Sequence, residues 1–241
     1  MNELLEILLD RFKRDIDEYY RTYLKDMNTI IDATLYNMGK YDPSNYVHRN
    51  ELDNMHRSIE EKIDVLFNDI EISLTHTLRD AYKGAYEMYD TDYDIVLFNY
   101  KMDEALNSLW SGANYKDRLK RHSYLLKFQS NAMANNGIVN HMGSKFIKTE
   151  LSKILSSQYS AMRALSTTEI TFITNQSVID YCNANSIVEV VVVDDDRCCD
   201  KCKANAGKRF RARNIKPDDY MMHTNCRCEI RPVYRKAKRK K

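Results

Sequence analysis

The sequence is poor in the two residues that interrupt regular structure. Proline occurs only three times in 241 residues, at Pro43, Pro217 and Pro232, and glycine six times. Because proline removes a backbone donor and clashes with the preceding helical turn, the proline-free stretch 44–216 permits long uninterrupted helices. No apolar run approaches the about 20 residues that a membrane-spanning helix needs. The N-terminus also lacks a basic segment followed by an apolar run, so no secretory signal is expected.

Positive charge is scarce in most of the chain and concentrated at its end. Residues 1–206 contain 24 Lys and Arg against 32 Asp and Glu, whereas residues 207–241 contain 13 against three. An acidic body with a basic end predicts that this end contacts an anionic partner.

Helical periodicity dominates the first three quarters of the chain. Apolar residues recur at three- and four-residue steps over 3–37 and about 50–88, which predicts two long helices. They should form an antiparallel hairpin, because neither can bury its apolar stripe alone. Shorter helices are expected over 92–112, 114–136 and 139–164, and Asn135-Asn136-Gly137 should end the second of these. A further helix should begin at the capping-box sequence Ser166–Glu169 and run to Cys182.

The pattern changes at Ile187, where six of seven residues to Val193 are β-branched. This composition predicts a strand. The expected fold is mainly α: a long N-terminal helical hairpin and helical bundle, then a small β/zinc-knuckle module (α+β) and a basic disordered tail. The expected domains are a hairpin arm (1–91), a helical body (92–186), the β-strand and knuckle module (187–234) and the tail (235–241).

Five of the six cysteines lie within 31 residues, from Cys198 to Cys228. A small secreted domain would spread its cysteines over a disulfide framework, whereas clustered thiols in a reducing compartment usually bind metal. Free structural thiols and disulfides in an oxidised particle remain alternatives. A redox role for the C-x-x-C pair lacks the βαβ context that it requires.

The spacing of these residues predicts one structural zinc site. Cys199 and Cys202 form a C-x-x-C pair, and His223, Cys226 and Cys228 follow about twenty residues later. Zinc suits mixed thiolate and imidazole ligands. Cys199, Cys202 and Cys226 are the favoured ligands, and the fourth is His223 or Cys228. Cys198 is disfavoured because adjacent side chains seldom converge, and Arg227 should point outward toward a carboxylate or phosphate.

These residues also resemble a known family. The run from Asp195 to Phe210, followed by His223-Thr-Asn-Cys-Arg-Cys-Glu-Ile-Arg-Pro232, is similar to the C-terminal signature of the phage Mu F-like head morphogenesis proteins. A Thr-Glu pair opens a helix upstream in that family, as Thr168-Glu169 is expected to do here. The resemblance covers about residues 105–234 and is specific only over 166–232; Thr224 replaces the family's usual proline.

The resemblance implies a minor head, or minor capsid, protein of a tailed phage. Such a protein is present in few copies in the virion, near the portal, and in the host cytoplasm during assembly. It would bind the portal protein or the major capsid protein, without enzymatic activity, and assist head assembly and DNA packaging or ejection. No membrane or small-molecule substrate is expected.

The basic tail suggests non-specific contact with packaged DNA. Its cations are Arg235, Lys236, Lys238, Arg239, Lys240 and Lys241, and a few phosphate contacts would give weak, salt-sensitive binding. A merely solubilising tail is the simpler alternative.

Two other functions also stay open: a cytoplasmic zinc-ribbon DNA-binding regulator and an HNH-like nuclease. The regulator needs a recognition helix, and the nuclease needs a free general-base histidine.

Overall fold

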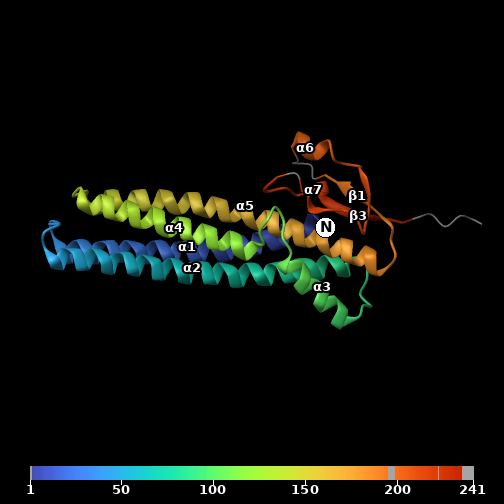
Figure 1. Ribbon diagram of the computed structural model, residues 1–241, viewed down its shortest axis with the longest axis horizontal. Coiled ribbons are helices and arrows are strands. Elements are labelled where there is room, and N and C mark those ends of the chain that lie inside the picture. The colour runs from blue at the N-terminus through green and yellow to red at the C-terminus, as the bar shows by residue number, and fades with distance from the viewer. Residues whose placement is uncertain (1, 195–198, 222, 235–241) are drawn as a thin grey trace, which may run out of the picture. The chain divides into compact units, whose positions relative to one another are not determined.

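The computed structural model describes residues 2–194, 199–221 and 223–234. Five helices precede the sheet region: α1 (Asn2–Met38), α2 (Tyr46–Glu87), α3 (Ile95–Asn107), α4 (Tyr115–Val139) and α5 (Ser144–Ala184). Strands β1 (Glu189–Val193), β2 (Arg209–Arg211) and β3 (Glu229–Val233) alternate with the single-turn helices α6 (Asp200–Lys203) and α7 (Pro217–Tyr220) (Figure 1). The chain is therefore mainly helical with one small antiparallel sheet, which confirms the predicted fold class.

The chain divides into two compact units, and their boundaries fall inside long helices. One unit comprises residues 13–73 and 116–163, and the other comprises residues 1–12, 74–115 and 164–241. The domain boundaries expected from the sequence lie instead in the turns between elements. No helix in the described part of the chain has the length and apolar character needed to cross a membrane.

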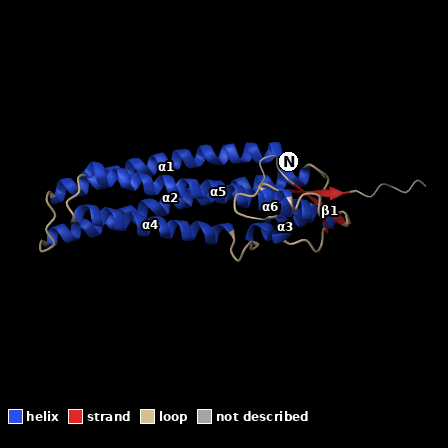
Figure 2. Cartoon of the chain, turned by 90° about the horizontal axis from the view of Figure 1, so that it is seen from above, coloured by secondary structure: helices blue, strands red, loops and turns tan. Residues whose placement is uncertain are grey.

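The unit of residues 13–73 and 116–163 is an up-and-down four-helix bundle made from α1, α2, α4 and α5 (Figure 2). The contacts between α1 and α2 show that these helices are antiparallel, because the residue number rises along α1 as it falls along α2. Asp15 accepts from Ser73, Asp26 pairs with Lys62, and Asn37 donates to Glu51. Ion pairs also join α2 to α4 through Asp64–Lys127 and α1 to α5 through Asp32–Lys148. The first two long helices therefore form the predicted antiparallel hairpin.

The core of the bundle is a stripe of aliphatic side chains from each helix. The fully buried members include Ile16, Ile31, Ile59, Ile63, Leu126 and Ile147. Each such side chain contributes about 1.5–3 kcal/mol when removed from water. Burial of these stripes explains why helices with so many charged residues are stable.

Gly137 does not stop α4, so the helix end predicted at Asn135-Asn136-Gly137 is wrong. The helix continues to Val139, and the turn follows at His141, whose φ is +55°. A Cβ atom at Gly137 would lie 2.5 Å from Cγ1 of Ile147 on α5. This glycine therefore serves close helix packing rather than helix termination.

The other unit contains α3 and the sheet, whose strand order is β2-β1-β3 with both pairings antiparallel. Val190 lies opposite Phe210 of β2 and Pro232 of β3. Val190 and Val192 are buried, whereas Glu189, Val191 and Val193 are partly exposed. The predicted strand over 187–193 is confirmed, with its start two residues later.

α3 begins at its cap Asp94 and ends at Asn107, earlier than the predicted end at Ser111-Gly112. After the helix, Trp110 and Ala113 pair across a tight turn in which Ser111 and Gly112 have φ values of +49° and +78°. The chain leaves the helix here, and Trp110 is buried.

The predicted helix start at Ser166–Glu169 is also wrong, because α5 is continuous through this segment. All four residues from Ser166 to Glu169 are buried. The hydroxyl of Thr168 donates to the carbonyl of Ala164 within the helix, at 2.8 Å. The polar residues therefore do not cap a new helix.

The predicted end at Asn183–Ser186 is confirmed, since α5 ends at Ala184 and Ser186 has a φ of +55°.

Candidate metal centre

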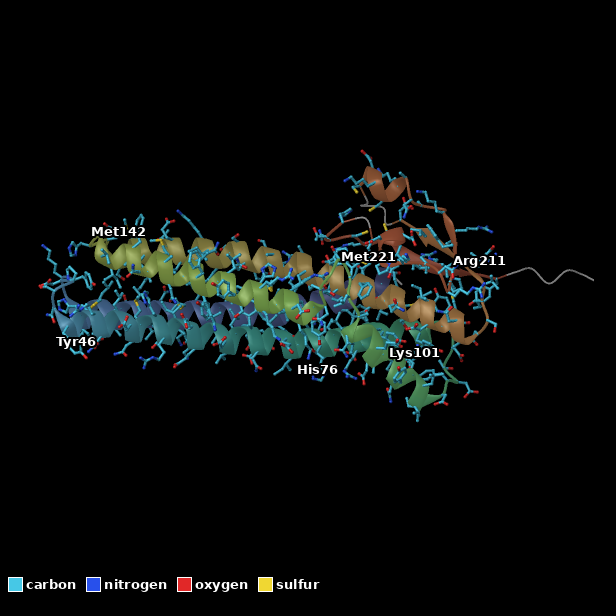
Figure 3. All side chains as sticks on the ribbon, viewed as in Figure 1. Tyr46, His76, Lys101, Met142, Arg211 and Met221 are labelled. Atoms are coloured by element: carbon cyan, nitrogen blue, oxygen red, sulfur yellow. The ribbon has the colours of Figure 1, made fainter. Side chains whose placement is uncertain are left out.

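Two short segments carry the predicted metal donors. Cys199 caps the single turn α6, and Cys202 lies within that turn. His223, Cys226 and Cys228 come from the segment between α7 and β3. Sulfur atoms gather in this region near the labelled Met221 (Figure 3). Cys198 lies outside the described residues, as do Asp195 and Asp196.

The donor atoms of Cys199, Cys202 and His223 form one compact group. The two sulfurs are 3.7 Å apart, and Nε2 of His223 lies 3.2 Å from each of them. Two thiolates bound tetrahedrally at 2.3 Å to one zinc ion would be about 3.8 Å apart. This group can therefore hold a metal ion.

A hydrogen bond fixes the tautomer that His223 needs for metal binding. Its Nδ1 lies 2.6 Å from the carbonyl oxygen of Thr224. Since a carbonyl can only accept, Nδ1 carries the proton and donates. The lone pair of Nε2 is then directed at the sulfurs of Cys199 and Cys202. Histidine ligands in metalloproteins are commonly oriented by such a second hydrogen bond.

The metal-free thiols differ in acidity. Hydrogen bonds, chiefly the one from the backbone amide of Cys202, lower the pKa of Cys199 to about 7. Burial raises the pKa of Cys202 to about 12. The hydrogen bond with Cys226, together with burial, also raises the pKa of Cys228. Cys199 is thus partly thiolate near neutral pH, whereas a bound metal must displace protons from the buried thiols.

A second group of donors shares Cys202 with the first. The sulfurs of Cys202, Cys226 and Cys228 all lie within 4.8 Å of one another, and all three residues are buried. The Cys226 sulfur is 3.7 Å from that of Cys202, which again matches a tetrahedral edge. The five predicted donors thus fall into two groups of three that share Cys202, whereas a tetrahedral ion requires four ligands.

Two polar side chains of α5 hold the segment that carries Cys226 and Cys228. The hydroxyl of Thr168 accepts from the backbone N–H of Asn225 at 2.7 Å. The amide of Asn175 donates to the Cys228 carbonyl and accepts from the Ile230 N–H, each at 2.8 Å. We call these two residues the α5 clamp. Sequence analysis singled out Thr168 only as part of a helix start and missed Asn175, although polar residues seven positions apart on one helix were an available signal.

Arg227 points away from the donors that flank it. Its Nη1 lies 2.6 Å from a carboxylate oxygen of Glu6, near the start of α1. The predicted outward contact with a carboxylate is confirmed. This ion pair is partly exposed, so its contribution to stability is small.

The predicted nucleic-acid contacts Arg235, Lys236, Lys238, Arg239, Lys240 and Lys241 lie outside the described residues. Asp194 follows β1 directly, as expected for a polar strand end. Comparisons of the whole chain with protein-family models, with characterised proteins and with solved structures find no significant match.

Proposed function

We propose that the cluster binds one structural zinc ion through Cys199, Cys202, His223 and Cys226. Mixed thiolate and imidazole donors with tetrahedral edge distances are typical of structural zinc sites. Four protein ligands leave no open position for a substrate or water. The ion would stabilise a segment whose sheet has only three short strands, too small to fold on its own core.

We further propose that the protein is a phage minor head protein, a non-enzymatic assembly factor that binds the portal or inner capsid. The observation that supports this most is that Cys202, from the first half of the family-like motif, shares one donor group with His223 and another with Cys226 and Cys228, which come from the second half. The tail would contact packaged DNA and so assist packaging or ejection.

The proposal is tested by locating the protein in purified phage particles with quantitative mass spectrometry. We expect a few copies per particle, retained in heads emptied of DNA. A Cys199→Ser/Cys202→Ser double variant should be depleted from particles, whereas a Cys182→Ala variant, which changes a buried α5 thiol outside the donor cluster, should be incorporated normally. Absence of the wild-type protein from particles would refute the proposal.

The two rival functions need features that the described residues do not supply. A zinc-ribbon regulator reads bases with a recognition helix, but α6 and α7 contain four residues each. An HNH-like nuclease needs a free general base, but Nε2 of His223, which is the one histidine in residues 187–234, faces two thiols. Sequence-specific mobility shifts would support the regulator, and plasmid nicking lost in His223→Ala would support the nuclease.

A further inference from the structure

A row of arginines occupies the open edge of the sheet. Arg209, Arg211 and Arg213 alternate along β2 and the turn after it, and all three side chains are exposed. Alternate residues of a strand point to the same face, so Arg209 and Arg211 share one face while Phe210 turns to the other. In Figure 3 the labelled Arg211 lies at the outer side of the sheet. We call these three residues the arginine row.

Within the part of the chain that the structure describes, none of the three arginines forms an ion pair. Glu229 of β3 already pairs with Arg231 at 3.1 Å. Glu189 lies opposite Arg211 in the ladder but forms no ion pair with it among the described residues. Surface charges of one sign that lack partners favour binding of the opposite charge.

The backbone of β2 adds donors at the same edge. The N–H of Ala212 donates to Val188, and the N–H of Val192 donates to Lys208. Because main-chain groups alternate in direction along a strand, the N–H groups of Arg209 and Arg211 point away from β1. β2 has no other strand beside it in the described sheet. Backbone N–H groups and arginines are both common partners of phosphate oxygens.

The spacing and composition of this edge select among anionic partners. Arginines two residues apart on a strand are about 6.6 Å apart, so each of the three can contact a different phosphate along one nucleic-acid strand. Single-stranded nucleic acid needs aromatic side chains for base stacking, and a membrane surface needs apolar side chains that insert. The other strand residues on this face are Glu189, Val191, Val193, Glu229, Arg231 and Val233, and none of them is aromatic.

We propose that the arginine row is a binding surface for the phosphate backbone of duplex DNA, without sequence preference. The inference goes beyond the proposed function, which places DNA contact at the tail, and it does not depend on incorporation into particles. Among the described elements after α5, the helices α6 and α7 have only four residues each, too few to read base edges in a groove, so affinity should come from phosphate contacts.

The test is fluorescence anisotropy with a labelled DNA duplex of random sequence and the full-length, zinc-loaded protein. Arg209→Gln/Arg211→Gln/Arg213→Gln should weaken binding about 10- to 100-fold at about 100 mM salt. It should also lower the slope of log K against log salt by about 3. The corresponding triple Arg→Lys variant should retain most of the affinity, because it keeps the charge.

The matched control removes the same charge elsewhere. Arg14, Arg21 and Lys25 are exposed on α1, and their triple replacement by Gln should leave both affinity and salt slope nearly unchanged. Unchanged melting temperature and zinc content would show that each variant is folded.

Several outcomes would overturn the proposal. The first is equal affinity for DNA in the wild type and the arginine-row variant. The second is an equal loss of affinity in that variant and in the α1 control. The third is a loss of affinity that occurs only when Lys238, Arg239 and Lys240 are changed. Tighter row-dependent binding to single strands, an acidic peptide or phosphatidylserine vesicles would assign the surface to another partner and refute it as well.

Discussion

Cys202 takes part in both groups of metal donors. Its sulfur lies 3.7 Å from the sulfurs of Cys199 and of Cys226, and the Cys228 sulfur lies within 4.8 Å of it. Because His223 already faces Cys199 and Cys202 with its free lone pair, one position remains for Cys226 or Cys228. The observed tetrahedral edge favours Cys226.

Single serine substitutions should separate the two remaining candidates. We expect Cys226→Ser to weaken zinc binding at least about 100-fold, because it removes a direct ligand. Cys228→Ser should change it by less than about tenfold. Competition with a chromophoric chelator measures both affinities, with Cys182→Ala as the control for loss of a buried thiol. The reverse order would make Cys228 the fourth ligand.

Asp180 is a carboxyl group whose burial is only partly compensated. Burial raises its pKa to about 6, although Tyr82 donates to it at 2.9 Å and Gln176 at 3.3 Å. In the unfolded chain its pKa is about 3.9. The folded state therefore binds the proton more tightly, and ionisation destabilises it as the pH rises through about 6.

Replacing Asp180 by Asn should remove this pH-dependent penalty. At pH 8 we expect the free energy of unfolding to rise by up to about 3 kcal/mol. Below about pH 4, where Asp180 is protonated in both states, the gain should vanish. Thermal denaturation across this pH range measures the difference, and Asp10→Asn on exposed α1 surface is the control. A gain independent of pH would contradict the assigned pKa.

At the scale of elements, α5 links the helical part of its unit to the donor segment. Thr168 and Asn175 lie two turns apart and bind backbone groups on either side of Cys226 and Cys228. Loss of Asn175 would leave the buried Cys228 carbonyl and Ile230 N–H without partners, which costs about 1–3 kcal/mol for each group. Loss of the Thr168 hydroxyl affects the N–H of the more exposed Asn225. The α5 clamp should therefore affect both stability and metal retention.

Asn175→Leu should lower the free energy of unfolding by about 2–6 kcal/mol, because two buried groups lose their partner, and Thr168→Val should lower it by about 1 kcal/mol. They should also speed zinc release, because Cys226 is then held less firmly. Thr149→Val is the matched control, since its hydroxyl is exposed and donates only within α5 to Lys145. Stopped-flow chelation and thermal melts measure the two effects. Zinc release as slow as in the wild type would show that the clamp does not position the ligand segment.

The sequence was sufficient wherever the signal is local. Periodic apolar residues gave the long helices, β-branched residues gave β1, and the Cys and His spacing gave the donor cluster. It failed at Gly137 and Ser166–Glu169, where typical end and start residues lie inside helices. Their roles depend on partners in other segments of the chain, Ile147 of α5 for Gly137 and Asn225 for Thr168. A pattern read within one segment cannot reveal such contacts.

At the scale of the whole molecule, the chain builds its two units from interleaved segments. The unit that carries the metal cluster takes residues from the start of α1, from 74–115 and from residue 164 onward. The four-helix bundle has an aliphatic core of its own. The sheet has three short strands, so its stability should depend on the metal far more than that of the bundle does.

Removal of zinc should therefore act unequally on the two units. After treatment with a strong chelator under reducing conditions, we expect amides in β1, β3 and residues 199–228 to lose most of their protection from hydrogen exchange. Amides of the bundle segments 13–73 and 116–163 should keep theirs, because no metal donor lies in them. Hydrogen exchange with mass spectrometry resolves these regions, and adding back zinc, but not magnesium, should restore protection. Equal loss in both units, or none in either, would contradict a metal that stabilises the sheet module alone.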